Sequence, residues 1–415
     1  MEANLLSKKN ASLLLIFIFI VETILIIFIT PPLVSSADKI NITDENNEIV
    51  NPVNGDQINA SNFKSESFIL IDAFTGKIIT ENNSFEKRPI ASITKIMSMI
   101  LVMDAIKKGD LMFDDVVPVS EYAYGFGGSQ VYLDPRETFT VHEMLKAVAI
   151  HSANDATVAL AEKVAGSEEA FVELMNEKAK KMGMNDTHFV DCSGLKAVGN
   201  YSTANDVAIM SREVVHNYPE IFEYTKIVHD TFRNGEFSLD NTNELVKNYQ
   251  GAIGLKTGYI SESGYCLSAV AKRDSLTLIS VVLGAPDSET RFEESKKLLD
   301  YGFSNFEIVT LDIKDTEAGL IKVDKGVKTS VKALISNDIV VLIKKDTALQ
   351  VDRVKNFEPQ LTAPVKKGQK VGEIIYEQDG QEIARVDVIA EENVEKASFF
   401  QLFVRMIKGW FGINT

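Results

Sequence analysis

Ser92 and Lys95 are three positions apart at the start of an apolar helical pattern, and together they could perform nucleophilic catalysis. Positions three apart on a helix face the same side, so the hydroxyl and the amine would be neighbours. A serine hydroxyl is a weak nucleophile until a base accepts its proton, and a lysine can be that base when burial or another cation lowers its pKa. A helix N-terminus adds positive potential, which favours the neutral amine. The spacing therefore predicts a serine nucleophile activated by a lysine.

Two further short segments carry residue types that suit the same reaction. Ser152-Ala153-Asn154 lies between two predicted helices, where a loop could aim both polar side chains into a cleft, and Lys256-Thr257-Gly258 precedes a predicted strand. S-x-x-K alone is a short pattern that occurs often by chance. The patterns S-x-x-K, S-D-N and K-T-G occur together in class A β-lactamases and penicillin-binding proteins, and this chain has all three in that order, with Ala153 replacing the aspartate.

Each of these residues has a distinct chemical role in the predicted site. Ser152 can relay a proton between the lysine base and a leaving amine, and Asn154 can hydrogen-bond that base and the substrate backbone. Lys256 supplies positive charge for a substrate carboxylate and lowers the pKa of the lysine base. Gly258 leaves room for a substrate along a strand edge. The oxyanion hole is expected from backbone N–H groups, including that of the nucleophile.

These motifs resemble the low-molecular-mass penicillin-binding proteins that are D-alanyl-D-alanine carboxypeptidases, serine peptidase family S11. The resemblance covers Phe63 to about Phe306, and more loosely the rest of the chain. It rests on several segments, namely Ala91–Met97, Ser152–Ala156, Ser193–Leu195, Tyr201–Ala204, Gly254–Gly258, and Arg291 before Leu298–Phe303. It departs from the family at Ala153, where glycine is more usual.

The resemblance implies an enzyme that removes the terminal D-alanine from peptidoglycan stem peptides ending in D-Ala-D-Ala, is acylated by β-lactam antibiotics and needs no cofactor. A cationic pocket for the free carboxylate distinguishes a carboxypeptidase, since an internal peptide bond has no charge there. Arg291 either assists that pocket or forms a surface ion pair. The resemblance assigns Ser92, Lys95 and Ser152 as catalytic, and Asn154, Lys256, Thr257, Gly258 and Arg291 as substrate-binding.

Other functions remain open at this stage. A β-lactamase needs a base that hydrolyses its acyl-enzyme quickly, and the segment Glu173–Asn176 has the wrong spacing for that glutamate. A non-catalytic peptidoglycan-binding module would have no need of both Lys95 and Ser152. A DD-endopeptidase that cuts cross-links is chemically close to a carboxypeptidase and stays an alternative.

The surrounding pattern predicts an α/β (α+β) domain in which an antiparallel sheet is covered by helices, as in the serine β-lactamase and transpeptidase fold. A strand hairpin comes first, helices lie in the middle and strands return last, so the first and last strands must meet. The predicted strands are 68–72, 77–80, 265–270 and 276–283. The predicted helices follow Ser92 and cover 141–149, 155–165, 168–182, 209–215 and 291–301.

The C-terminal part has a different pattern of apolar and polar residues. Short alternating segments with Gly turns predict a small all-β domain over 309–392. A helix is expected over 395–412. Its apolar face carries Phe399, Phe403, Met406, Ile407 and Trp410, and its opposite face carries Gln401, Arg405 and Lys408. That pattern favours a helix lying in a membrane interface, the alternative being a helix packed on the protein itself.

The N-terminus predicts export. An apolar run over 13–29 follows Lys8 and Lys9 and precedes Ser35-Ser36-Ala37, which suits a signal peptide over 1–37, with an uncleaved anchor as the alternative. Residues 38–62 are polar and predict a flexible linker before the peptidase domain over 63–306. The enzyme is therefore expected outside the cytoplasm, attached to the outer face of the membrane.

Composition excludes other classes of function. The net charge of −16 argues against nucleic acid as a partner. The histidines and the two cysteines show no metal-ligand spacing, and Cys192 and Cys266 are expected to be buried fillers.

Overall fold

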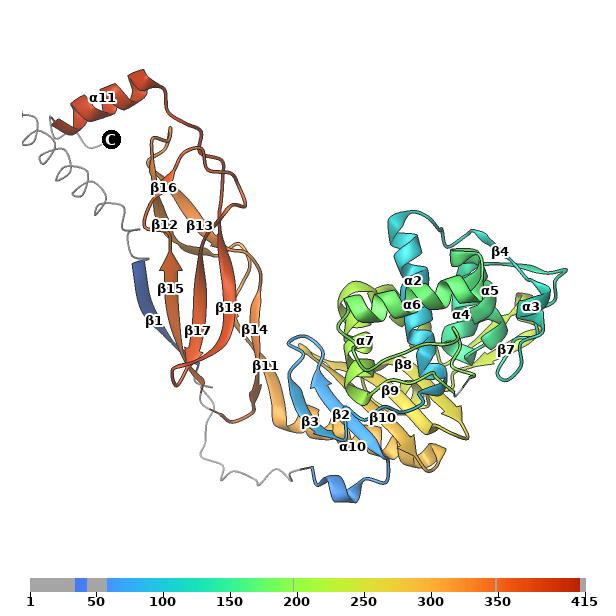
Figure 1. Ribbon diagram of the computed structural model, residues 1–415. Helices are drawn as coiled ribbons and strands as arrows, with labels where there is room; N and C mark the ends of the chain where they lie inside the picture. The colour runs from blue at the N-terminus through green and yellow to red at the C-terminus, as the bar shows by residue number, and fades with distance from the viewer. Residues whose placement is uncertain (1–33, 43–57, 197, 348, 411–415) are drawn as a thin grey trace, which may run out of the picture. The chain divides into compact units, whose positions relative to one another are not determined.

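The computed structural model describes residues 34–42, 58–196, 198–347 and 349–410 (Figure 1). They fall into two compact units, one within 47–309 and 342–347, the other within 1–46, 310–341 and 348–415. The sequence assigned 342–347 to the C-terminal β-domain. The structure places this segment in the first unit, where the backbone N–H of Lys345 donates to the carbonyl of Asn305.

The first unit is built on a five-stranded antiparallel sheet in the order β3-β2-β10-β9-β8. The predicted meeting of first and last strands is confirmed, because β2 pairs with β10 from Leu278 opposite Asp72 to Leu283 opposite Ser67. β8 is an edge strand. The strands are β2 (Ser67–Asp72), β3 (Ile78–Asn82), β8 (Ala252–Ile260), β9 (Gly264–Arg273) and β10 (Leu276–Ala285).

Alternating side chains give this sheet two apolar faces. Ile69, Ile71 and Val281 belong to the larger core that contains the central helices, whereas Phe68 and Leu70 belong to a second core with apolar residues of α10 (Ser288–Asn305). Helices therefore cover both faces, as Figure 1 shows, and the predicted fold class is confirmed.

The central helices of this unit carry Lys95 and Asn154 of the predicted site and border its other residues. They are α2 (Lys95–Lys108), α4 (Val141–His151), α5 (Asn154–Ala165), α6 (Glu168–Lys181) and α7 (Ala204–Asn217). Shorter elements connect them, namely α3 (Glu121–Tyr124), α8 (Phe222–Thr225), α9 (Leu245–Asn248), the 3-10 turns η1 (Ala60–Asn62), η2 (Ala91–Thr94), η3 (Pro219–Ile221) and η4 (Arg233–Gly235), and the hairpins of β4 (Val116–Pro118) with β5 (Thr138–Thr140) and β6 (His229–Phe232) with β7 (Phe237–Asp240).

The second unit contains a seven-stranded sheet in the order β1-β15-β17-β18-β13-β12-β16, antiparallel except between β12 and β16. Its strands are β1 (Val34–Ile42), β12 (Glu317–Asp324), β13 (Ser330–Ile335), β15 (Leu349–Phe357), β16 (Leu361–Thr362), β17 (Lys370–Gln378) and β18 (Gln381–Ala390). β11 (Phe306–Asp312) pairs separately with β14 (Ile339–Lys344). This is the all-β architecture that the alternating pattern predicted.

β1 differs from the prediction of a flexible linker over 38–62. Its residues pair with β15 from Val34 opposite Phe357 to Ile42 opposite Leu349. Backbone N–H and C=O groups supply these ladder bonds whatever the side chains, so the polar composition did not preclude a strand. The Ser35-Ser36-Ala37 segment lies within β1, while the apolar run over 13–29 lies outside the described residues.

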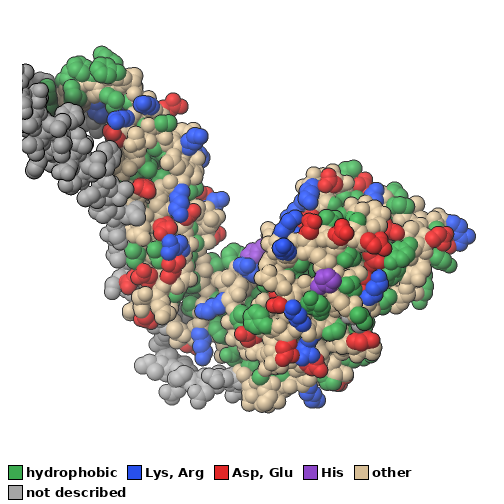
Figure 2. All heavy atoms as spheres, viewed as in Figure 1, with side chains coloured by type: hydrophobic (Ala, Val, Ile, Leu, Met, Phe, Trp, Pro, Cys, Tyr) green, Lys and Arg blue, Asp and Glu red, His purple; other side chains and the backbone are tan. Residues whose placement is uncertain are grey.

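The C-terminal helix α11 spans Phe399–Trp410 and so begins later than the predicted 395. The preceding residues belong to the β-domain instead, because Val394 pairs with Val365 and the Ala397 N–H donates to the Lys325 carbonyl. Figure 2 shows apolar side chains gathered on α11, and the exposed ones are Phe399, Phe400, Phe403, Met406 and Trp410. Among the described residues, no helix is long and apolar enough to cross a membrane.

Candidate active site

Ser92 lies in the 3-10 turn η2 that leads directly into α2. The preceding residue, Ala91, has a φ of 45°, a left-handed conformation that non-glycine residues rarely adopt. Ile90, Ala91 and Ile93 are buried, so packing holds this turn in place. The nucleophile is therefore presented from a rigid corner at the N-terminal end of a buried helix.

The Lys95 amine lies beside the Ser92 hydroxyl, as the spacing predicted. Its Nζ is 2.9 Å from Ser92 Oγ, 2.6 Å from Asn154 Oδ1 and 2.7 Å from the carbonyl oxygen of Ser193. Lys95 is fully buried. Three acceptors surround the amine, so its position is fixed by groups from three separate segments of the chain.

Burial lowers the pKa of Lys95 to about 8, because the charged form loses its hydration. The nearby carboxylates of Asp191 and Asp155 act in the opposite direction. The predicted lowering of this pKa by Lys256 is not seen at Lys95, where burial is the cause of the lowering. The repulsion between the two amines is seen at Lys256, whose pKa is held well below its usual range by burial and then by the charges of Lys95 and Arg291.

Ser152 and Asn154 lie on the turn between α4 and α5. Ser152 ends α4 in a left-handed conformation with φ of 63°, and Asn154 begins α5. Both side chains are buried. Asn154 contacts the base, as expected, and its Nδ2 donates to the Gly127 carbonyl at 2.7 Å. Within the described part of the chain, the Ser152 hydroxyl makes no hydrogen bond, so it is not hydrogen-bonded to the Lys95 amine.

Lys256 and Thr257 lie on the edge strand β8, a strand that the sequence analysis did not assign. Lys256 is buried, and its Nζ donates to the Thr257 carbonyl at 3.1 Å. The Thr257 hydroxyl is 2.7 Å from that of Thr242, a residue for which the sequence carried no signal. β8 thus brings a lysine amine and a hydroxyl to the edge strand of the sheet, beside the turn that carries Ser92.

Gly258 makes a close approach to the protein's own chain that the sequence did not predict. A Cβ atom at this position would lie 2.7 Å from the Ile90 carbonyl and 3.1 Å from the backbone N of Ser92. The absent side chain therefore makes room for the turn that carries the nucleophile, rather than only for a substrate. This close approach joins the K-T-G segment to the S-x-x-K segment.

Arg291 does not form the surface ion pair that was one of its two interpretations. It is buried at the start of α10, and its guanidinium donates to the Gly258 carbonyl at 3.3 Å and lies over the rings of Tyr265 and Phe292. Its proximity to β8 adds positive charge near Lys256.

Ser193–Leu195 is one of the segments that carry the resemblance, and the turn that begins at Asp191 supplies a direct contact to Lys95. The Asp191 carboxylate accepts hydrogen bonds from Ser193 and Gly194 backbone N–H groups, and this turn aims the Ser193 carbonyl at Lys95. Gly194 has a φ of +79° and no room for a Cβ against Ala91. An aspartate two residues before Ser-Gly is a turn signal that could have indicated this loop.

Cys192 and Cys266 are buried and unpaired, as predicted. Within the described ranges, His, Cys, Asp and Glu form no group that could hold a metal ion.

Comparisons with known proteins support the resemblance. A family model described as D-alanyl-D-alanine carboxypeptidase matches residues 54–287, and the C-terminal domain of penicillin-binding protein 5 matches 306–396. The chain is 40% identical over 351 residues to the D-alanyl-D-alanine carboxypeptidase DacF of Bacillus subtilis, covering 84% of this chain and 90% of that protein.

Solved structures give the same result. Penicillin-binding protein 5 from Haemophilus influenzae has 33% sequence identity and a TM-score of 0.72, covering 80% of this chain and 98% of that one. Penicillin-binding protein D2 from Listeria monocytogenes in its ampicillin-bound form has 32% identity and a TM-score of 0.54, covering 58% and 98%. The chain therefore belongs to the D-alanyl-D-alanine carboxypeptidases of serine peptidase family S11, the low-molecular-mass penicillin-binding proteins.

Proposed function

We propose that this enzyme removes the terminal D-alanine from peptidoglycan stem peptides through an acyl-enzyme on Ser92, with Lys95 as the general base. The observation that carries this proposal is the set of three acceptors around the buried Lys95 amine. Carbonyl oxygens accept hydrogen bonds but cannot donate them. The neutral amine therefore places its two hydrogens on Asn154 and Ser193, and its lone pair faces the Ser92 hydroxyl.

The reaction then proceeds by acyl transfer. Ser92 Oγ attacks the carbonyl carbon of the D-Ala-D-Ala bond as its proton passes to Lys95 Nζ, and backbone N–H groups, including that of Ser92, stabilise the oxyanion. The C–N bond breaks as the proton moves from Lys95 through Ser152 to the leaving amine. Water then hydrolyses the ester and regenerates the serine. The hydroxyl of Ser152 makes no bond among the described residues, which leaves it available for this relay.

Recognition of the free carboxylate is assigned to β8. Lys256 and Thr257 contribute a charge and a hydroxyl at the strand edge, and Arg291 lies behind Gly258 with a second positive charge. A carboxylate gains strongly from charge-assisted hydrogen bonds in a buried site. Penicillins carry a carboxylate as well, and the relative from Listeria monocytogenes was crystallised with ampicillin bound.

Release of D-alanine tests the proposal directly. The wild type, Ser92→Ala and a control, Ser238→Ala, are incubated with a D-Ala-D-Ala pentapeptide and with a cross-linked muropeptide, and products are identified by mass spectrometry. Ser238 is an exposed serine of β7. D-alanine release by the wild type and the control, but not by Ser92→Ala, is expected. Undiminished release by Ser92→Ala would refute the assignment of Ser92 as the nucleophile. Cleavage of the cross-link alone would indicate a DD-endopeptidase.

The proposed location is outside the cytoplasm, with attachment to the outer face of the cytoplasmic membrane. The exposed aromatic face of α11 supports this proposal. Arg405, on the opposite side of the helix, donates to the carbonyls of Gly326 and Val327, which ties α11 to the β-domain. A helix held by its polar side leaves its aromatic side to enter a lipid interface. The export signal is proposed from the sequence of residues 1–37.

A further inference from the structure

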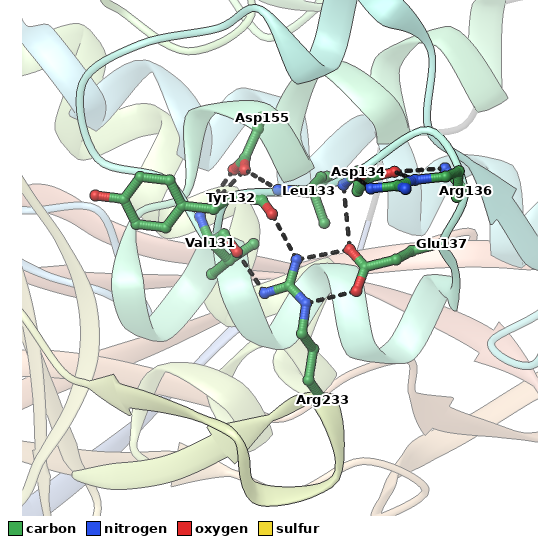
Figure 3. Close-up of polar contacts among 8 residues, drawn as sticks. All are labelled: Val131, Tyr132, Leu133, Asp134, Arg136, Glu137, Asp155 and Arg233. Carbon is green, nitrogen blue, oxygen red and sulfur yellow. Dashed lines mark hydrogen bonds and ion pairs between the residues drawn. The ribbon is translucent and has the colours of Figure 1, made fainter.

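The loop over 126–137 borders the Ser152–Asn154 turn and is held from two sides (Figure 3). On one side, the Asp155 carboxylate accepts hydrogen bonds from the backbone N–H groups of Val131, at 3.1 Å, and Leu133, at 3.0 Å. On the other side, the Arg233 guanidinium donates to the carbonyls of Val131 and Tyr132, both at 2.6 Å. Two backbone N–H groups and two backbone carbonyls of this short stretch are therefore bonded to charged side chains.

The same loop contacts Asn154 directly. The Gly127 carbonyl accepts from the Asn154 side chain at 2.7 Å, and the Ser129 carbonyl accepts from the Asn154 backbone N–H at 2.7 Å. A Cβ on Gly128 would lie 2.7 Å from Asn154 Nδ2, so the fit is tight. The position of the loop thus determines where Asn154 Oδ1 meets the Lys95 amine.

Arg233 comes from a distant part of the sequence, the turn between β6 and β7, and its side chain is itself fixed. Its Nε and Nη2 bind the two carboxylate oxygens of Glu137, each at 2.7 Å, and the guanidinium lies over the rings of Phe139 and Phe232. Only 16% of the side chain is exposed. A planar fork can satisfy two carbonyls and a carboxylate at once, which a lysine ammonium cannot do with the same geometry.

We propose that Arg233 is a positioning residue for the catalytic amine: by clamping the 126–137 loop to the β6–β7 hairpin, it fixes Asn154 and Asp155 against Lys95. This inference rests on the proposed role of Lys95 as the base. The charged and titratable groups around that amine are Asp155, Asp191, Cys192 and Lys256. Of these, Asp155 is the one that the clamp positions.

The test measures the acylation rate of Arg233→Ala and Arg233→Lys by a fluorescent penicillin across pH. Loosening the loop moves two groups away from Lys95, the Asn154 oxygen and the Asp155 carboxylate, both of which favour the charged amine. The pKa of Lys95 then falls, so the rising limb of the pH profile shifts to lower pH. Misplacement of the amine lowers the limiting rate by up to about 100-fold. Arg233→Lys keeps the charge opposite Glu137 and is expected to lie between wild type and Arg233→Ala.

The matched control is Arg136→Ala, which removes an arginine charge from the clamped loop itself without touching the contacts of Arg233. Arg136 is 89% exposed and pairs only with Asp134 among the described residues. A purely structural role for Arg233 would lower the fraction of active enzyme without moving the midpoint of the pH profile, and an unmoved midpoint in both Arg233 variants overturns the inference. Labelling of Ser92→Ala, by contrast, would refute the proposed function itself.

Discussion

The side-chain oxygen of Asn154 accepts a hydrogen bond from the Lys95 amine at 2.6 Å, and this contact helps to decide where the lone pair of the amine points. With Asn154 and the Ser193 carbonyl each taking one N–H, the remaining direction leads to the Ser92 hydroxyl. In the proposed mechanism, Asn154 therefore orients the base as well as lining the substrate pocket.

Two different replacements of Asn154 should therefore shift the pKa of Lys95 in opposite directions. Asn154→Ala removes an acceptor that favours the ammonium form, so the midpoint of the acylation pH profile should fall. Asn154→Asp places a negative charge beside the amine, so the midpoint should rise. Stopped-flow measurement of penicillin acylation across pH checks both, and midpoints that move in the same direction would contradict the assignment.

In the wild type, acylation should accelerate as pH rises through about 8. The reason is that burial lowers the pKa of Lys95 to about 8 and only the neutral amine accepts the serine proton. Lys95→Arg should lose acylation by roughly 100- to 10,000-fold, because a guanidinium stays protonated. A flat profile in the wild type, with normal acylation of Lys95→Arg, would exclude this base.

Lys256→Ala should reduce the preference for a free C-terminus. Wild-type enzyme is expected to cleave a pentapeptide with a terminal carboxylate much faster than its C-terminal amide, since an incoming carboxylate favours the charged form of the buried Lys256 amine. The variant should lose most of this discrimination, measured as the ratio of kcat/KM for the two peptides. A ratio equal to that of wild type would mean that another residue binds the substrate carboxylate, and Arg291 would then be the next residue to replace.

Gly258→Ala should disturb both stability and acylation. The added Cβ meets the Ile90 carbonyl at 2.7 Å, and such overpacking costs about 1–3 kcal/mol. Because the displaced backbone carries the nucleophile, the acylation rate of the folded variant should fall too. Gly125→Ala is the control, since a Cβ there has no neighbour closer than 3.4 Å. Denaturant unfolding and penicillin labelling give the two readouts, and a Gly258→Ala variant that matches the control in both would contradict the close packing.

Removing α11 should release active enzyme from membranes. The chain is best ended at Ser398, because the β-domain uses Val394 and Ala397 in its own hydrogen bonds. Sedimentation with liposomes and D-alanine release are measured on the shortened and the full chain. Retention of the shortened protein on lipid would assign attachment to another segment, such as the N-terminal apolar run.

The sequence was sufficient to predict the elements whose periodicity is strong and whose ends are marked. The helix predicted after Ser92 is present as α2, and it ends at Lys108 with Gly109 in the left-handed conformation that glycine favours. The pairing of β2 with β10 followed from the order of strands and helices alone. Ser92 and Lys95 meet because their spacing of three puts them on the same side of a helix, and the contact of Asn154 with Lys95 was expected from the S-A-N segment.

What the sequence could not predict depends on contacts between distant segments. β8 was missed because Lys256 and Thr257 interrupt its apolar alternation, and the β6–β7 hairpin, with Arg233 at its turn, carries no strong strand signal. The Ser193 carbonyl is a backbone group that the local turn aims at Lys95. The Thr242 hydroxyl contacts that of Thr257 on another segment of the chain. Such groups become visible only when the fold brings them together.

The most direct test of the account is to locate the covalent bond. The protein is incubated with a penicillin, digested, and the peptides are sequenced by mass spectrometry, with Lys95→Ala and Ser92→Ala treated in parallel. We predict an adduct with the mass of the intact penicillin on Ser92 of the wild type, and none on either variant. An adduct on another residue, or an undiminished adduct on Ser92 when Lys95 is alanine, would contradict the serine–lysine mechanism.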